Sequence, residues 1–283
     1  MRSSRALRAR RSLTALSLTF ASVCLAFTAA PGAQAADDGG KPAAAGKYVA
    51  LGDSYATAPG TGEYDNPDAP CRRGPSTYSR LWAQQHSSYA FVEASCSGAT
   101  TAEVQSQQVP QLTADTTLAT VQVGGNDVGF VDVLKNCILT ADDKDCIAGV
   151  EAAKAAATGK LPGALAGTYA AMKAKAPNAK VVVMGYPRLY TIGGSCGILG
   201  LSDAERSALN SAADTLASVT SEQAKKAGFT YVDPREAFDP HTICSDGDAW
   251  VTSLEWSDLD ESYHPNKAGH RDGYLPLLNG VTG

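Results

Sequence analysis

Basic residues are scarce once the first 35 residues are set aside. The remaining 248 residues hold 19 Lys and Arg against 29 Asp and Glu, which gives a formal charge of −10. Such an acidic chain has no electrostatic attraction for nucleic acid or for anionic lipid. We therefore expect no nucleic-acid partner and no stable insertion into a membrane.

The sequence also lacks the spacings of a metal site. It has only four His, and no two of its Cys stand two residues apart as in a zinc knuckle. Acidic residues gather at 63–68 and at 246–248, but neither group has the full ligand series of a calcium motif. These absences predict no required metal and no cofactor.

The first 35 residues have the pattern of an export signal. Five Arg without an acidic residue precede the apolar run Leu13–Ala30, and the small-residue stretch Ala33–Ala35 follows it. A membrane anchor fits this order less well, because the small residues favour cleavage. We expect a signal peptide at 1–35, a flexible segment at 36–46, a single domain at 47–283 and a secreted protein.

Six cysteines remain after the predicted signal peptide. An even number of Cys in an exported chain indicates three disulfides, with fifteen possible pairings. We favour pairing in sequence order, because each bond then closes a local loop. The expected bonds are Cys71–Cys96, Cys137–Cys146 and Cys196–Cys244.

Short apolar runs alternate with longer helical stretches along the rest of the chain. Strands are expected at 47–52, 90–94, 117–123, 180–185 and 229–232, and helices at 78–86, 161–175 and 202–227. Ser202 and Glu205 have the spacing of a capping box. The alternation predicts an α/β fold with a central parallel sheet and helices on both faces. Such sheets bind ligands at the carboxyl ends of their strands.

Ser54 directly follows the first predicted strand, at the place where a parallel sheet builds its site. A serine hydroxyl is a weak nucleophile and needs a base beside it. Among the four His, His264 precedes Pro265 at a loop-to-helix junction, whereas His86, His241 and His270 have a structural context.

Four segments, taken in order, resemble the conserved blocks of the SGNH or GDSL hydrolases. They are Gly52-Asp53-Ser54-Tyr55, Ser97-Gly98-Ala99-Thr100, Gly124-Gly125-Asn126-Asp127 and His264. They span nearly the whole chain after the signal peptide. The six-cysteine layout is similar to that of secreted bacterial lipases, esterases and phospholipases of this family. The resemblance implies a three-layer α/β/α sandwich of flavodoxin-like type with a five-stranded parallel sheet.

The resemblance also implies a role for each block. Ser54 is expected to attack an ester carbonyl, and His264 to take its proton. The backbone N–H groups of Ser54 and Gly98 and the side-chain amide of Asn126 would form the oxyanion hole. The residue types suit that task, because glycine allows close backbone approach and asparagine is a neutral donor.

The group that orients His264 is left open by the sequence. The family usually has Asp three residues before this His, and Glu261 occupies that position here. Some secreted members use a backbone carbonyl instead, for which Ser262 is the candidate. We favour the Ser262 carbonyl over Glu261 or the nearby Asp258 and Asp260. A carbonyl can fix the His tautomer, although it stabilises imidazolium less than a carboxylate does.

A second serine, Ser195, lies in a Gly-x-Ser-x-Gly pattern at 193–197. That pattern marks a nucleophile elbow only when a strand runs directly into the serine, and here eight residues separate Gly185 from Gly194. We interpret Ser195 as part of a loop.

The resemblance implies hydrolysis of a carboxylic ester through an acyl-enzyme, with acylglycerol or glycerophospholipid as the substrate class. A carbohydrate acetylesterase and a non-catalytic secreted binding protein remain as alternatives. A lipid substrate requires an apolar groove, and a sugar requires an aromatic and polar one. We expect a monomer.

Overall fold

The computed structural model describes residues 45–139, 142–193, 196 and 200–283. Five strands form one parallel sheet in the order β2-β1-β3-β4-β5. The strands are β1 Gly46–Gly52, β2 Tyr89–Glu93, β3 Thr116–Gln122, β4 Lys180–Met184 and β5 Thr230–Val232. The predicted signal peptide and all but two residues of the segment 36–46 lie outside the described residues, so both stay predictions.

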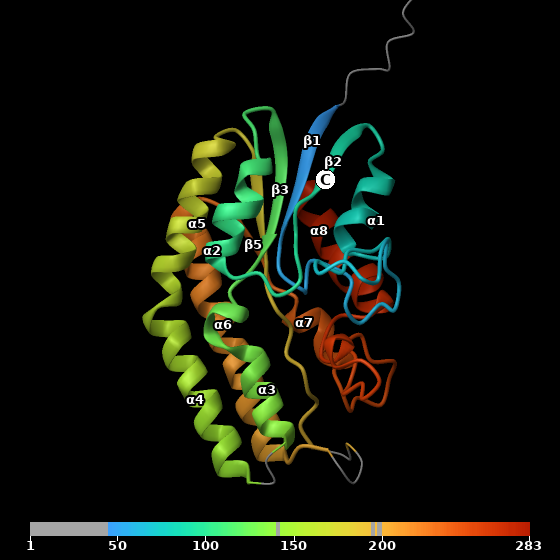
Figure 1. Cartoon of the computed structure of the whole chain (residues 1–283), viewed down its shortest axis with the longest axis vertical. Coiled ribbons are helices and arrows are strands. Elements are labelled where there is room, and N and C mark those ends of the chain that lie inside the picture. Colours follow the sequence, from blue (N-terminus) through green and yellow to red (C-terminus); the bar gives the residue numbers. More distant parts are fainter. Residues whose placement is uncertain (1–44, 140–141, 194–195, 197–199) are drawn as a thin grey trace, which may run out of the picture. The chain divides into compact units, whose positions relative to one another are not determined.

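Helices cover both faces of the sheet. Figure 1 shows α4, α5 and α6 on one face and α1 and α8 on the other. The helices are α1 Tyr78–Gln85, α2 Thr101–Glu103, α3 Phe130–Leu139, α4 Asp143–Gly159, α5 Leu161–Lys175, α6 Asp203–Ala227, α7 Arg235–Phe238 and α8 Leu275–Thr282. This is the three-layer α/β/α architecture that the sequence predicts.

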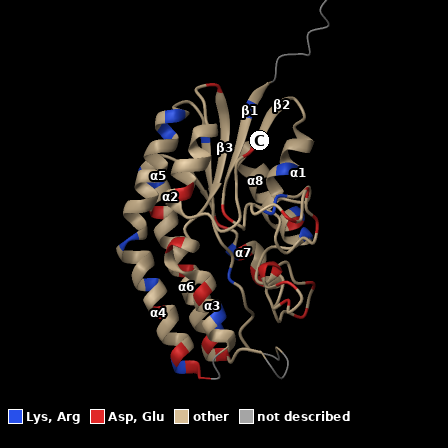
Figure 2. Cartoon of the chain, viewed as in Figure 1, with Lys and Arg blue, Asp and Glu red and all other residues tan. Residues whose placement is uncertain are grey.

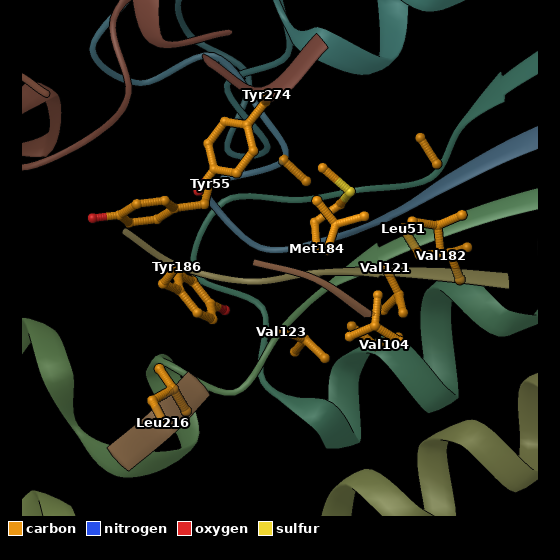
Figure 3. Packing of buried hydrophobic residues seen from close by; sticks show 14 of the residues in the cluster. Leu51, Tyr55, Val104, Val121, Val123, Val182, Met184, Tyr186, Leu216 and Tyr274 are labelled. Atoms are coloured by element: carbon orange, nitrogen blue, oxygen red, sulfur yellow. The ribbon is translucent and has the colours of Figure 1, made fainter. Parts of the chain in front are cut away.

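The central strands β1, β3 and β4 are mostly buried, because helices pack against both faces of the sheet. In β4, for example, all residues after Lys180 are buried. Figure 3 shows Leu51, Val121 and Val182 packed together in this core, with Tyr55 and Tyr186 further along. The tyrosines therefore mark the passage from the core to the carboxyl ends of the strands.

Most predicted elements agree with the structure within one residue at each end. The expected helix at 161–175 matches α5, and the Ser202–Glu205 capping box is present at the start of α6. The sequence analysis did not identify α3 or α4. That omission matters, because α3 lies beside the functional site.

The structure contains the three disulfides in the expected sequential pairing: Cys71–Cys96, Cys137–Cys146 and Cys196–Cys244. The first joins the loop before α1 to the loop after β2, and the second joins α3 to α4.

Among the described helices, none has both the length and the apolar composition that crossing a membrane requires.

Candidate active site

Ser54 lies in a tight turn at the carboxyl end of β1. Gly52 has a φ of +141°, and a Cβ there would be 2.5 Å from the Gln122 carbonyl oxygen of the neighbouring strand. Only glycine fits such a position without strain. The Asp53 N–H donates to the same Gln122 carbonyl at 2.9 Å, so the turn is fixed against β3. Ser54 follows at the sheet edge, where ligands of parallel sheets bind.

His264 meets Ser54 from the other end of the chain. Its Nε2 is 2.8 Å from Ser54 Oγ. Three hydrogen bonds with Thr252 hold the His264 backbone. The His264 N–H donates to Thr252 Oγ1 at 3.2 Å, and the His264 carbonyl accepts from the Thr252 N–H at 2.9 Å and from the Thr252 hydroxyl at 3.2 Å. Serine and imidazole are thus within the distance that proton transfer needs.

The residue before His264 has an unusual backbone. Tyr263 has a φ of +63°, a left-handed conformation that is costly for a bulky residue. Its carbonyl accepts a 2.6 Å hydrogen bond from the buried Tyr55 hydroxyl. Tyr55 comes directly after Ser54, so this bond connects the serine turn to the segment that carries His264.

Burial lowers the pKa of His264 from 6.5 to about 4, and the Ser262 carbonyl is the largest influence in the opposite direction. No side chain in the described residues bonds to Nδ1. The Ser262 carbonyl favours the protonated ring, although its contact lacks full hydrogen-bond geometry. The imidazole is therefore neutral at pH 7, with a backbone oxygen as the nearby acceptor.

The carboxylate of Glu261 binds Gly60, Arg72 and Tyr64 rather than the imidazole of His264. One oxygen accepts from the Gly60 N–H at 2.7 Å, and the other accepts from Arg72 at 2.5 Å and from the Tyr64 hydroxyl. Asp258 and Asp260 also pair with Arg72, at 2.8 Å and 3.4 Å. All three acids are thus engaged with Arg72.

Gly98 and Asn126 lie on the same pocket as Ser54. Asn126 Nδ2 donates to the Ala99 carbonyl at 3.1 Å, which fixes the amide and leaves its second N–H free to donate. Gly98 has a φ of +80°. In the described part of the chain, the N–H groups of Ser54 and Gly98 have no hydrogen-bond partner. Three hydrogen-bond donors are therefore available in the pocket that also contains the Ser54 hydroxyl.

The pocket over Ser54 measures about 460 Å³ and has apolar walls. One wall is a face of α3, and the facing wall is the loop that leads to His264. The apolar side chains that line it are Phe130, Val131, Leu134, Ile138, Leu254 and Leu259. The sequence did not locate these walls, since α3 was not predicted.

Comparison with known proteins identifies the family. The GDSL-like lipase/acylhydrolase family matches residues 50–271, which is more than three quarters of the chain. The chain belongs to this family. It is therefore a carboxylic ester hydrolase, as its four sequence blocks indicate.

Relatives of this GDSL-like hydrolase are bacterial enzymes. Lipase 1 of Streptomyces coelicolor is 44% identical over 91% of this chain and 93% of its own length. The crystal structure of phospholipase A1 from Streptomyces albidoflavus is 47% identical, covers 83% of this chain and 98% of its own, and has a TM-score of 0.80. The extracellular lipase of Streptomyces rimosus is 40% identical, covers 84% of this chain and 100% of its own, and has the same TM-score.

Two acidic residues of the GDSL-like blocks, Asp53 and Asp127, accept hydrogen bonds that hold the segments of the site together. Asp53 accepts from the Tyr186 hydroxyl and from the Tyr55 N–H at 2.9 Å, and burial raises its pKa to about 7. Asp127 accepts from the Thr101 N–H at 3.0 Å, which joins the third block to the residue that follows the second. The sequence offered no signal for Tyr186, which contacts Asp53 from 133 residues away.

The other candidates have structural surroundings or lie outside the description. His86 stacks on Trp82 and His241 on Trp250, each with ring centroids 3.9 Å apart, and His270 is fully buried. Ser195 is outside the described residues. Glu63 forms a 2.5 Å ion pair with Lys267, and the described ranges contain no cluster of metal-ligating side chains.

Proposed function

We propose that this GDSL-like hydrolase is a secreted lipolytic enzyme that cleaves acyl esters of glycerophospholipids or acylglycerols. The observation that carries the proposal is the 2.8 Å contact between Ser54 and His264 at the base of an apolar pocket. Apolar walls suit an acyl chain, and relatives named lipase and phospholipase A1 support the same class. The three disulfides and an extracellular relative support export.

In the proposed reaction Ser54 Oγ attacks the ester carbonyl while His264 Nε2 takes the hydroxyl proton. The tetrahedral intermediate collapses to an acyl-enzyme, and His264 returns the proton to the leaving alcohol. A water molecule then attacks the acyl-enzyme, with His264 as base again, which releases the fatty acid and restores Ser54. The Ser262 carbonyl orients the imidazole, since Glu261 is committed to other partners.

The N–H groups of Ser54 and Gly98 and the Asn126 amide would stabilise the oxyanion. Asn126→Ala should lower kcat by about 10²–10³-fold, the usual loss for one such donor. KM should change little, because the bond strengthens only as charge develops. Steady-state kinetics measure both; a change in KM alone would show that Asn126 only positions the substrate.

An activity panel tests the function. The purified protein should hydrolyse p-nitrophenyl esters of medium and long acids and release fatty acid from phosphatidylcholine or triacylglycerol. It should leave acetylated xylan intact, because the pocket walls are apolar rather than sugar-binding. Ser54→Ala should remove all turnover while circular dichroism remains unchanged. Preferential release of acetate from xylan would favour the carbohydrate esterase instead.

A further inference from the structure

Large apolar side chains are exposed on the two segments that form the walls of the pocket, α3 and the loop that leads to His264. Val131 on α3 and Leu259 on the facing loop both line the pocket, yet 42% and 53% of their surfaces are exposed. Trp256 is 71% exposed and lies between Leu254 and Leu259 on the same loop. We call Val131, Trp256 and Leu259 the apolar rim. Exposed apolar groups gathered at one place usually mark an interaction surface.

The loop that carries Trp256 is held firmly in place. The Glu255 N–H donates to Ser262 Oγ at 2.8 Å, directly beside Trp256. Further along, Asp258 and Glu261 are anchored to Arg72 at 2.8 Å and 2.5 Å. The indole is therefore presented to the outside by a structured loop, not released from the core by local unfolding.

The loop beside the apolar rim is negatively charged, which favours some lipid headgroups over others. Residues 252–262 contain Glu255, Asp258, Asp260 and Glu261 and no basic residue. Arg72 and Lys135, the basic residues that line the pocket, balance only two of these four charges. Figure 2 shows the acidic residues of the loops that follow α7. Such a rim repels anionic headgroups, whereas a zwitterionic headgroup presents its outer ammonium to carboxylates.

We propose that the apolar rim docks on the surface of zwitterionic lipid aggregates, with Trp256 in the headgroup layer. This inference rests on the proposed function and adds the physical form of the substrate. The rim opens directly into the pocket that reaches Ser54, so its occupant must deliver an ester. A lipid surface does so, because one acyl chain can pass from the aggregate along the α3 wall without crossing water. A protein or a second copy bound there would close the pocket.

Tryptophan emission provides a direct measurement. Of the three Trp, Trp82 is 2% exposed and Trp250 stacks on His241, so an emission shift on binding reports Trp256. The probe is a titration of phosphatidylcholine vesicles into the Ser54→Ala protein, which cannot hydrolyse them. We expect a blue shift, and vesicle sedimentation should give weaker binding when phosphatidylglycerol is added.

Trp256→Ser and Trp256→Phe form the matched pair. The serine variant should bind phosphatidylcholine vesicles about tenfold more weakly, because it loses a large apolar contact, and the phenylalanine variant should retain most of the affinity. In the active protein, both should hydrolyse monomeric p-nitrophenyl butyrate within about twofold of the parent, since Trp256 does not line the pocket.

Three results would overturn the inference: equal losses on vesicles and on the monomeric ester, tighter binding to anionic vesicles, or dimerisation through the rim in light scattering. Failure of the proposed function is distinguishable, since it would appear as no hydrolysis of any lipid ester. Vesicle binding by the Ser54→Ala protein is measured independently of that outcome.

Discussion

Glu261 and His264 are three residues apart, and the carboxylate turns to Gly60, Tyr64 and Arg72. Its side chain is mostly shielded from solvent, at 16% exposure, so these bonds stabilise the loop that ends at His264. In the mechanism that we propose, Glu261 therefore holds the loop in position, and the Ser262 carbonyl orients the imidazole of His264.

Glu261→Gln tests that division. The amide keeps the shape and can still accept from Gly60, so kcat should stay within about tenfold of the parent, whereas loss of a true triad acid costs about 10⁴-fold. Ester hydrolysis by the folded variant is the measurement, with His264→Ala as the inactive reference. A loss close to that reference would identify Glu261 as the missing acid.

The buried imidazole also determines the acid limit of the reaction. The proposed mechanism needs a neutral His264, whose pKa is lowered by burial to about 4. We expect kcat/KM to rise with pH through a midpoint near 4, and to be flat at neutral pH. A profile on a soluble ester gives the midpoint directly. A midpoint near the ordinary value of 6.5 would mean that water reaches the ring.

The same protons affect folding. The unfolded chain binds a proton on each His near pH 6.5, but buried His264 and His270 hold theirs only below about 4 and about 3. Below pH 6.5 these two His therefore bind protons in the unfolded chain but not in the folded one. Their contribution to the free energy of unfolding decreases as the pH falls. Burial raises the pKa of Asp53 to about 7, so the folded chain binds this proton more readily than the unfolded chain does. Its contribution to the free energy of unfolding therefore increases as the pH falls.

Among the elements, α3 has the clearest link to substrate choice. It supplies Phe130, Leu134 and Ile138 to the wall of the pocket, and the Cys137–Cys146 bond ties it to α4. A helix that forms one wall by itself determines the width of the groove. Chain-length preference should therefore depend on its side chains.

Ile138→Asp places a charge in that wall at a partly exposed position, so the helix should still fold. We expect kcat/KM for p-nitrophenyl palmitate to fall at least about tenfold, because an acyl chain then meets a hydrated carboxylate. Hydrolysis of p-nitrophenyl acetate should stay within about threefold. Equal losses on both esters would place Ile138 in the support of the catalytic groups rather than in an acyl groove.

Elements whose signals are local could be predicted, and elements whose position depends on distant contacts could not. The apolar run of β4 and the capping box at Ser202 are visible in a few residues, and both agree with the structure. The role of α3 depends on the loop around Leu254, more than a hundred residues later. Likewise, nothing near Tyr186 indicates that its hydroxyl supports Asp53.

At the scale of the whole molecule, the Cys71–Cys96 bond connects two parts of the site. Arg72 follows one cysteine and anchors the loop of Glu261, while Ser97 and Gly98 follow the other. The Ser97 N–H donates to the Cys71 carbonyl at 3.2 Å, beside the bond. The side of the proposed oxyanion hole and the side of His264 are thus connected through one disulfide.

The double variant Cys71→Ser and Cys96→Ser should lose about 3 kcal/mol of unfolding free energy, the expectation for a loop of this length. It should also lower kcat on short esters, because Gly98 is no longer fixed. Denaturant unfolding and kinetics measure the two effects. As control, Cys137→Ser with Cys146→Ser should lose similar stability yet mainly raise KM for long esters; the same kinetic pattern in both would refute a specific role of the first bond.

The hydroxyl and imidazole that meet at 2.8 Å are separated by 210 residues of sequence. The loop that carries His264 must therefore pack against the turn after β1 before Ser54 has a base beside it. If the protein is exported and acts on lipid as we propose, a chain cut short before residue 264 carries the nucleophile but lacks the base that it needs.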